Sequence, residues 1–335
     1  MVSRSAATPV ARLTVRLAAS ITTLCATLAL ATLAGAQTFP SKPVKLITGY
    51  PPGGSADFLT RLMAEEMTKN LGVAVVAENR PGAGATIASE AVAKSTPDGY
   101  TVFNSTHHAI NKALYKKLSY DPDKDFVAIT RVATGPLVIC VKNDLPIKSL
   151  RELIAYAKAN PGKLFNANSG NGSSPHLAGV DFMTTAGVKF TTVQFKGGGP
   201  AAQSLIAGDT DVMFATPPTV MGFIRAGRMR ALAITSKNAS PSIPGLPGAG
   251  EAGLPGYDHT FSFGLYAPAG TPPAVLRRLH EAAVKGLARP EVKEKIAFQG
   301  MDATPSASPE AFEAELKAEA PMWERVVRES GARVE

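Results

Sequence analysis

From residue 37 onward the sequence alternates short apolar or β-branched runs with longer segments of helical period. Such alternation predicts an α/β protein whose sheets are mostly parallel and are covered by helices on both faces. The predicted strands are residues 44–50, 73–77, 100–104, 137–141, 164–167, 191–195, 211–215, 230–235 and 264–267. The predicted helices are residues 55–70, 83–94, 149–160, 174–187, 200–208 and 217–227.

A Pro- and Gly-rich stretch at residues 240–256 interrupts this alternation and suits a surface connection. We expect the chain to pass between two lobes near Gly135-Pro136 and again near residues 236–240. Roughly 300 residues are enough for two domains that each bury a core. The predicted division is a first lobe of residues 37–135 plus 240–335 and a second lobe of residues 136–239.

The first 36 residues have the pattern of a cleavable export signal. A membrane anchor is the alternative, but the apolar run contains several threonines and is shorter than about 20 clean residues. The basic start contains Arg4, Arg12 and Arg16, and the apolar run covers residues 17–33. Ala34-Gly35-Ala36 supplies the small residues before the cleavage site, which precedes Gln37. This pattern predicts a protein that is exported from the cytoplasm.

Cysteine and charge exclude several classes of protein. Cys25 lies inside the signal without the spacing of a lipid-modified cysteine, so cleavage leaves Cys140 alone and rules out an intramolecular disulfide. The formal net charge is +8, and loss of the three signal arginines leaves +5. Basic residues occur singly or in pairs such as Lys116-Lys117, without aromatic interleaving, which argues against a nucleic-acid partner.

The turn at residues 50–57, Tyr-Pro-Pro-Gly-Gly-Ser-Ala-Asp, joins the first predicted strand to the first predicted helix. Its glycines allow a ligand to approach the backbone, and the unpaired N–H groups of a helix start suit a carboxylate or a phosphate. It lacks the Lys-Ser/Thr of a nucleotide P-loop. The alternative is an ordinary tight turn, with Ser55 as the helix cap and Asp57 in the first helical turn.

Two later loops have the same design of strand, Gly-rich turn and helix start. Residues 168–176 would present hydroxyls and backbone donors, and residues 195–200 include Lys196, which could face an anion or remain solvated. Residues 81–86 resemble a fragment of a dinucleotide-binding turn, but its third glycine and the later acidic residue are missing. The sequence therefore predicts no cofactor.

The sequence contains little that indicates a catalytic site. No Gly-x-Ser-x-Gly elbow surrounds Ser173 or Ser174, and the five histidines lack the spacing of a zinc site. We therefore expect no metal and no enzyme, although an exported hydrolase with a serine from residues 169–174 stays open as an alternative.

Seven ordered motifs resemble the substrate-binding proteins of tripartite tricarboxylate transporters, the Bug family. They cover essentially the whole chain after the signal. The motifs are Tyr50-Pro51-Pro52-Gly53-Gly54 with Asp57 and Arg61, residues 78–84, residues 97–100, residues 120–122 with Asp125-Phe126, residues 195–198, Gly208 with Asp211, and residues 267–272.

The resemblance implies a monomeric, two-lobed periplasmic binding protein of type II-like fold with a ligand cleft between its lobes. It further implies a small carboxylate ligand, held by backbone amides, hydroxyls and waters without a salt bridge, and delivery to the membrane subunits of a transporter. A sensor kinase is the alternative partner. The residues expected to bind the ligand are Tyr50, Pro52, Gly53, Gly54, Ser55, Asp57, Ser105, Thr106, Asn168, Ser169, Ser173, Ser174, His176, Lys196, Gly197 and Asp211.

The sequence departs from the family pattern at aromatic positions. Phe195 stands where a tyrosine is common, and Phe261-Ser262-Phe263 stands near a position often occupied by tryptophan. Together with Phe58 these rings could favour an aromatic carboxylate, although core packing is the alternative role.

Overall fold

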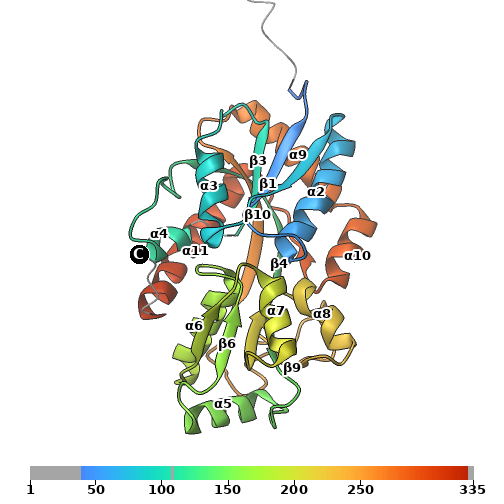
Figure 1. Ribbon diagram of the computed structural model, residues 1–335. Helices are drawn as coiled ribbons and strands as arrows, with labels where there is room; N and C mark the ends of the chain where they lie inside the picture. The colour runs from blue at the N-terminus through green and yellow to red at the C-terminus, as the bar shows by residue number, and fades with distance from the viewer. Residues whose placement is uncertain (1–38, 107–108, 331–335) are drawn as a thin grey trace, which may run out of the picture. The chain divides into compact units, whose positions relative to one another are not determined.

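The computed structural model describes residues 39–106 and 109–330 (Figure 1). The predicted export signal lies outside these residues. The compact unit that begins at Lys42 contains both sheets and all the helices described below. Within the described residues, no helix is both long and apolar enough to span a bilayer.

The first of two sheets has six strands in the order β11-β4-β10-β3-β1-β2. β3, β1 and β2 are parallel neighbours, whereas β10 runs antiparallel to β3, and β4 pairs antiparallel with both β10 and β11. The strand bounds are β1 Val44–Thr48, β2 Val75–Asn79, β3 Thr101–Ser105, β4 Phe126–Pro136, β10 Thr260–Pro268 and β11 Asp302–Ala303.

The second sheet has five strands in the order β7-β6-β8-β5-β9. β7, β6 and β8 are parallel neighbours, and β5 pairs antiparallel with β8 and with β9. The strand bounds are β5 Val138–Val141, β6 Phe165–Asn168, β7 Thr191–Gln194, β8 Val212–Ala215 and β9 Arg230–Ile234.

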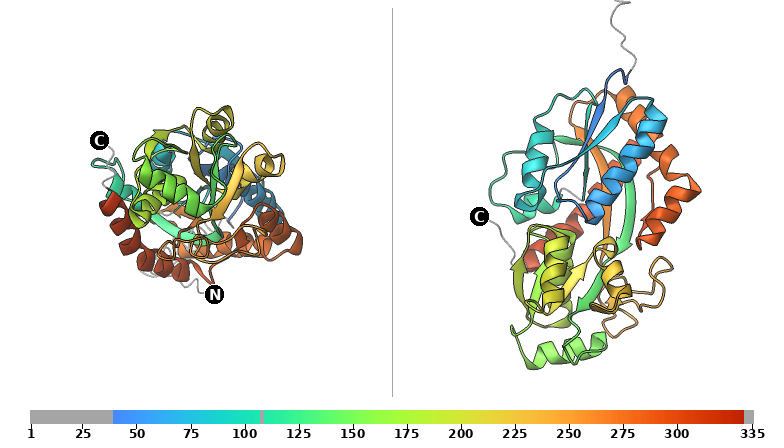
Figure 2. Two further views of the ribbon diagram at one scale, coloured as in Figure 1. Left: turned by 90° about the horizontal axis from the view of Figure 1, so that it is seen from below. Right: turned by 45° about the vertical axis from the view of Figure 1, so that its right-hand side comes forward.

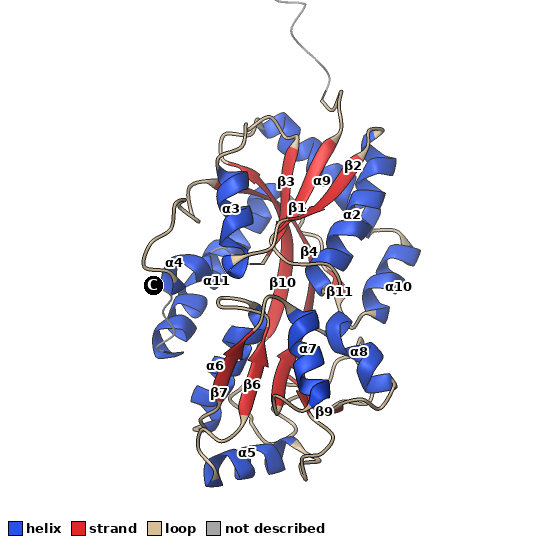
Figure 3. Cartoon of the chain, in the orientation of Figure 1, coloured by secondary structure: helices blue, strands red, loops and turns tan. Residues whose placement is uncertain are grey.

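Helices accompany each sheet. The green and yellow helices α5 to α8 gather around the five-stranded sheet, and the others gather around the six-stranded sheet (Figures 1, 2 and 3). The bounds are α2 Ser55–Leu71, 3₁₀ turn η1 Ala83–Ala85, α3 Thr86–Ala93, α4 Ala109–Leu114, α5 Leu150–Ala159, α6 Ser174–Ala186, α7 Gly198–Ala207, α8 Pro217–Arg225, α9 Pro273–Leu287, α10 Pro290–Phe298 and α11 Pro309–Ser330.

The predicted α/β class is confirmed, but the sheets are mixed and not mostly parallel. β4 ends at Pro136 and β5 begins at Val138, so an almost continuous strand leaves one sheet and enters the other. The chain returns after β9 along β10. These connecting strands run against the neighbouring strands of the βαβ units, which explains the antiparallel half of each sheet.

Two local predictions were wrong. The 11-residue strand β4 was not predicted, because Gly135-Pro136 reads as a breaker; Pro136 is its last residue, a position that proline tolerates. The helix expected at residues 83–94 begins instead as the turn η1, since Ala83, Gly84 and Ala85 all have positive φ. Left-handed backbone cannot continue an α-helix.

Each sheet has its own apolar core. Val138, Cys140 and Met213 pack with α7 and α8 beside the five-stranded sheet, and burial raises the pKa of the Cys140 thiol. Ile47 and Phe103 belong to the cluster beside the six-stranded sheet. A smaller cluster joins Leu114 of α4, Leu177 of α6, and Trp323 and Val327 of α11. Because α4 follows β3 and α6 follows β6, this third cluster connects elements of both sheets.

Candidate ligand-binding site

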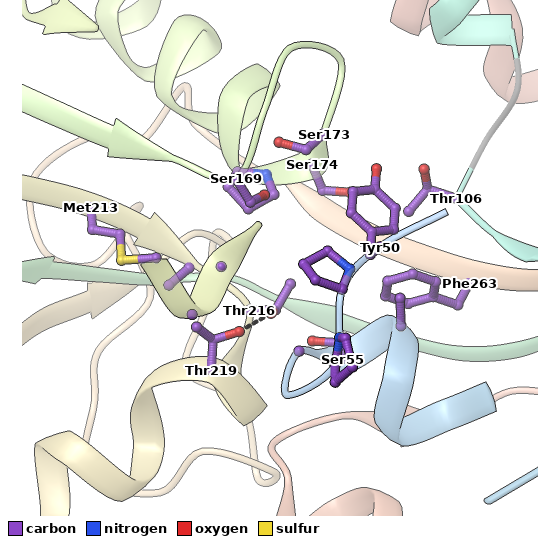
Figure 4. A pocket seen from close by; sticks show the side chains of 18 residues that line it. Tyr50, Ser55, Thr106, Ser169, Ser173, Ser174, Met213, Thr216, Thr219 and Phe263 are labelled. Carbon is purple, nitrogen blue, oxygen red and sulfur yellow. Dashed lines mark hydrogen bonds between the residues drawn. The ribbon is translucent and has the colours of Figure 1, made fainter. Parts of the chain in front are cut away.

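A pocket lies where strands of both sheets end and the helices after them begin (Figure 4). Parallel strands in one sheet end at the same edge, which brings the loops after β1 and β3 together, and likewise those after β6 and β8. Its space, including the open mouth, is about 540 Å³. The 18 lining residues are Tyr50, Pro51, Pro52, Gly54, Ser55, Ala56, Thr106, Ser169, Ser173, Ser174, Pro175, Gly198, Gly199, Met213, Ala215, Thr216, Thr219 and Phe263.

Helices α2, α6, α7 and α8 begin at this pocket. The N-caps of α2 and α7 are Gly54 and Gly197, and no side chain caps either helix. The first N–H groups of these two helices are therefore available to a ligand, at the positive end of the helix dipole. α8 begins with Pro217-Pro218, which has no N–H to offer. Donors for an anion are thus concentrated at the starts of α2 and α7.

Hydroxyl groups occur in pairs on opposite sides of the pocket (Figure 4). The hydroxyls of Thr216 and Thr219 share a hydrogen bond of 3.0 Å. The hydroxyls of Tyr50 and Thr106 lie near one another on the other side, and burial raises the pKa of Tyr50 to about 12. The phenol is therefore neutral at physiological pH. In the Thr216–Thr219 pair one hydroxyl hydrogen is engaged within the pair, and the other can be donated to a ligand.

The pocket can recognise charge without an ionic side chain. Among the described residues that line it there is no Lys, Arg, His, Asp or Glu. Apolar side chains, including Met213 and Phe263, fill the space between the polar groups. Neutral donors that converge on a largely apolar cavity can bind a carboxylate, because helix starts and hydroxyls supply its hydrogen bonds.

Ser55 gives the most direct indication that a ligand completes the site. The residue is 3% exposed and lines the pocket, and its Oγ has no hydrogen-bond partner among the described residues. A buried hydroxyl without a partner is unfavourable, and native structures seldom leave one so. A ligand oxygen in the pocket would accept this hydrogen bond.

We expect Ser55→Ala to weaken carboxylate binding about tenfold or more, because a hydrogen bond to a charged acceptor is lost. The unfolding free energy without ligand should not fall, since the alanine removes an unsatisfied group. Calorimetric titration and urea unfolding measure the two effects. Thr48→Val is the matched control, because the buried Thr48 hydroxyl also lacks a partner among the described residues but lies outside the pocket lining. Equal affinity losses in both variants would contradict the role of Ser55.

Comparison with known proteins identifies a family that this chain matches. The family model described as tripartite tricarboxylate transporter family receptor matches residues 59–331. The chain belongs to this receptor family. Its members are binding proteins, so the expectation that the chain is not an enzyme is confirmed, and the serine hydrolase alternative is set aside.

Individual relatives agree over nearly the whole receptor. BugT of Bordetella pertussis is 36% identical over 323 residues, which cover 95% of this chain and 98% of BugT. The structure of R. palustris Rpa4515 with adipate matches with a TM-score of 0.83 and 32% identity, covering 88% of this chain and 98% of that one. The periplasmic binding protein BugD matches with a TM-score of 0.83 and 33% identity, covering 88% and 99%.

Half of the residues expected to bind ligand meet in the receptor's pocket. Their backbone or side chains come from loops of both sheets, and Figure 4 shows several of them facing a common space. The expected residues that line the pocket are Tyr50, Pro52, Gly54, Ser55, Thr106, Ser169, Ser173 and Ser174.

Asp57 and Gly53 lie behind the α2 start and not in the pocket lining. The Asp57 carboxylate accepts hydrogen bonds from Gly53 N at 3.1 Å, Arg61 Nε at 2.9 Å and Asn79 Nδ2 at 3.0 Å. These hydrogen bonds fix the conformation of the turn before α2. We expect the backbone N–H groups of that turn, and not the Asp57 carboxylate, to contact the ligand.

Three other expected residues lie outside the pocket lining. Ser105 is buried at the end of β3, and buried Asn168 accepts a hydrogen bond from Gly170 N at 3.0 Å. Asp211 lies beyond the amino end of β8, whereas the pocket is at the carboxyl end; its carboxylate pairs with Lys142 at 2.8 Å and accepts from Phe165 N at 2.8 Å. Asp211 is thus engaged away from the lining.

Ten lining residues were not named individually among those expected to bind ligand, although Pro51, Ala56, Pro175, Gly198 and Gly199 lie within the three loops that the sequence singles out. Phe263 reads mainly as a core residue, and Met213 and Ala215 read only as part of an apolar strand. A usable signal exists for the Thr216-Pro217 start of α8, since a strand followed directly by a helix start also marks the other walls. The ten residues are Pro51, Ala56, Pro175, Gly198, Gly199, Met213, Ala215, Thr216, Thr219 and Phe263.

His176 holds the loop before α6. It is 6% exposed, and its Nδ1 accepts a hydrogen bond from Gly172 N at 3.1 Å, so the neutral ring carries its proton on Nε2. Burial lowers the pKa of His176 from 6.5 to about 4.

Because this folded-state pKa lies below the unfolded one, the unfolded chain binds more protons between pH 6.5 and 4. The neutral ring's stabilising contribution is complete above pH 6.5 and is lost as the pH falls toward 4. We expect His176 to account for about 2 kcal/mol of lost unfolding free energy between pH 7.5 and pH 5. Urea unfolding of wild type and His176→Asn at both pH values measures this share. An equal pH dependence in the two proteins would contradict it.

Among residues 39–106 and 109–330, no three His, Cys, Asp or Glu side chains are arranged to hold an ion. His107 and His108 lie outside the described residues.

Proposed function

We propose that this receptor binds a small carboxylate in the pocket between its two sheets and delivers it in the periplasm to the membrane subunits of a tripartite tricarboxylate transporter. The observation that carries the proposal is the pocket itself: uncapped starts of α2 and α7, no ionic side chain among its described lining residues, and the unpaired hydroxyl of Ser55. The structure of one relative, Rpa4515, is a structure with adipate, which supports a carboxylate ligand here.

The proposed receptor is a monomer with a first lobe of residues 37–135 plus 240–335 and a second lobe of residues 136–239. Its predicted signal, residues 1–36, would direct it to the periplasm. Ligand binding would favour a closed arrangement of the lobes, because only then do the donors of both sheets reach one molecule. The connections between β4 and β5 and between β9 and β10 would serve as the hinge.

The experiment is a panel of carboxylates added to protein that has been unfolded and refolded to remove any bound solute. A ligand at about a hundred times its Kd should add about 2.7 kcal/mol to the unfolding free energy, and the midpoint should rise by several degrees. The panel consists of succinate, malate, citrate, glutamate, nicotinate, benzoate and terephthalate. Absence of any shift with every acid would contradict the proposal.

The single tryptophan gives a second readout. The indole of Trp323 lies 5.2 Å from the ring of His259, between centroids, and packs with Leu114 and Leu177. These leucines belong to helices that follow strands of different sheets. A relative movement of the proposed lobes should therefore change the fluorescence of Trp323 when the acid is added, while a ligand bound at an unrelated surface should not.

A further inference from the structure

A second chamber adjoins the pocket and shares Tyr50, Pro51 and Ser169 with it. With open mouths included, this outer chamber has about 1340 Å³ against about 540 Å³ for the pocket. Its other lining residues come from loops of both sheets and include Ala83, Gly84, Tyr115, Asn171, Gln194 and Lys196.

Close contacts between the loops of the two sheets build the chamber walls. The Tyr115 hydroxyl donates a hydrogen bond to Ala83 O at 2.9 Å, and Gly84 lies so near Asn171 that a Cβ on it would be 2.3 Å from the Asn171 carbonyl oxygen. On the other side, a Cβ on Gly197 would be 2.5 Å from Pro51 Cγ. The wall that carries Lys196 is therefore held beside the pocket mouth.

The outer chamber differs from the pocket in charge. Lys196 is the one ionic side chain among the described residues that line either space. It is exposed and forms no ion pair with any described residue. The amide side chains of Asn171 and Gln194 line the same chamber. An unpaired ammonium and amide donors at the mouth suit an anionic group better than an apolar one.

We infer that the outer chamber is a second subsite, which takes the distal carboxylate of an elongated dicarboxylate through Lys196 while the first carboxylate lies in the pocket. This inference rests on the proposed function and adds to it a ligand class and a residue that selects it. The first carboxylate meets only neutral donors, whereas the distal one meets a cation. Lys196 then distinguishes a dicarboxylate from a monocarboxylate of equal chain length.

The test uses pairs of acids with the same chain length: succinate and butyrate, adipate and hexanoate, and terephthalate and benzoate. Kd values are measured by calorimetry for wild type, Lys196→Gln and Lys189→Gln. Lys189 is a matched control, because it is also an exposed lysine next to β7. It precedes the amino end of that strand, whereas Lys196 follows the carboxyl end. Both variants lower the net charge equally.

In wild type, the dicarboxylate of at least one longer pair should bind more tightly than its monocarboxylate. Lys196→Gln should weaken the dicarboxylate about three- to tenfold and leave the monocarboxylate unchanged, as expected for a partly solvated ion pair. The difference should shrink as salt is added. Lys189→Gln should change neither acid, and Ser55→Ala should weaken both acids alike.

Equal effects of Lys196→Gln on both acids of a pair, or equal effects of Lys196→Gln and Lys189→Gln, would overturn the second subsite. A series in which no dicarboxylate binds more tightly than its monocarboxylate partner would also overturn the second subsite. In these cases the proposed function stands if the monocarboxylates bind. If wild type binds neither acid of any pair, the second subsite and the proposed function fail together.

Discussion

Replacement of Gly197 by alanine is expected to weaken carboxylate binding about tenfold to a hundredfold. The new Cβ would be 2.5 Å from Cγ and 3.0 Å from Cδ of Pro51, which follows β1 of the other sheet. Relief of such overlap typically requires about 1–3 kcal/mol, and here it must come from separation of the two loops that enclose the pocket. Calorimetric titration of Gly197→Ala with the acid that binds wild type measures the effect.

Gly197 also has φ +124, which an alanine adopts only with strain, so the variant should lose about 1–3 kcal/mol of unfolding free energy in addition. Gly208→Ala separates the two effects, because Gly208 ends the same helix with φ +88 and has open space around it. It should lose stability and keep its affinity. Unchanged affinity in Gly197→Ala would contradict closure across this contact.

Replacement of Asp57 by alanine is expected to lower the unfolding free energy by about 2 kcal/mol and to weaken binding about tenfold. The substitution removes the acceptor of the Gly53 N–H and one of the two acceptors of Asn79 Nδ2, which also donates to Tyr50 O, and loss of hydrogen bonds to a charged carboxylate is destabilising. The turn before α2 would lose the conformation that presents Gly54 and Ser55 to the ligand. Urea unfolding and titration on one sample measure both losses.

Lowering the pH should remove part of the same unfolding free energy from the wild-type protein. Burial alone would raise the pKa of the Asp57 carboxyl, but hydrogen bonds from Arg61, Gly53 and Asn79 hold it below its usual range. The stabilising contribution is therefore present above that usual range and is lost as the pH falls through and below it.

Glu65→Ala is the matched control for Asp57→Ala on the same helix, since Glu65 is exposed and pairs with Lys69. Equal losses in Glu65→Ala and Asp57→Ala would contradict the role assigned to Asp57.

The local parts of the fold and site could be predicted because their causes are local. The loop after β1 and the loop after β6 each combine glycines with a helix start, and this pattern reveals a place for an anion before any partner is known. Ser55, Ser173 and Ser174 could be identified for the same reason. Their presence in one pocket depends on the return of the chain along β10, and no local pattern determines that.

The missed parts depend on tertiary context. Met213 and Phe263 are buried apolar residues in strands, and only the arrangement of β8 and β10 decides that they also line the pocket. Asp57 and Asp211 are carboxylates near predicted loops, yet hydrogen bonds with neighbouring loops hold both outside the lining. Residue type indicates what a side chain can do, whereas packing decides what it faces.

A crystal structure of the refolded receptor with the acid that gives the largest thermal shift would show whether the pocket holds the ligand. We expect electron density for a carboxylate beside the starts of α2 and α7, with one oxygen accepting a hydrogen bond from Ser55 Oγ. Density for the acid elsewhere, with the pocket filled only by water, would contradict this expectation.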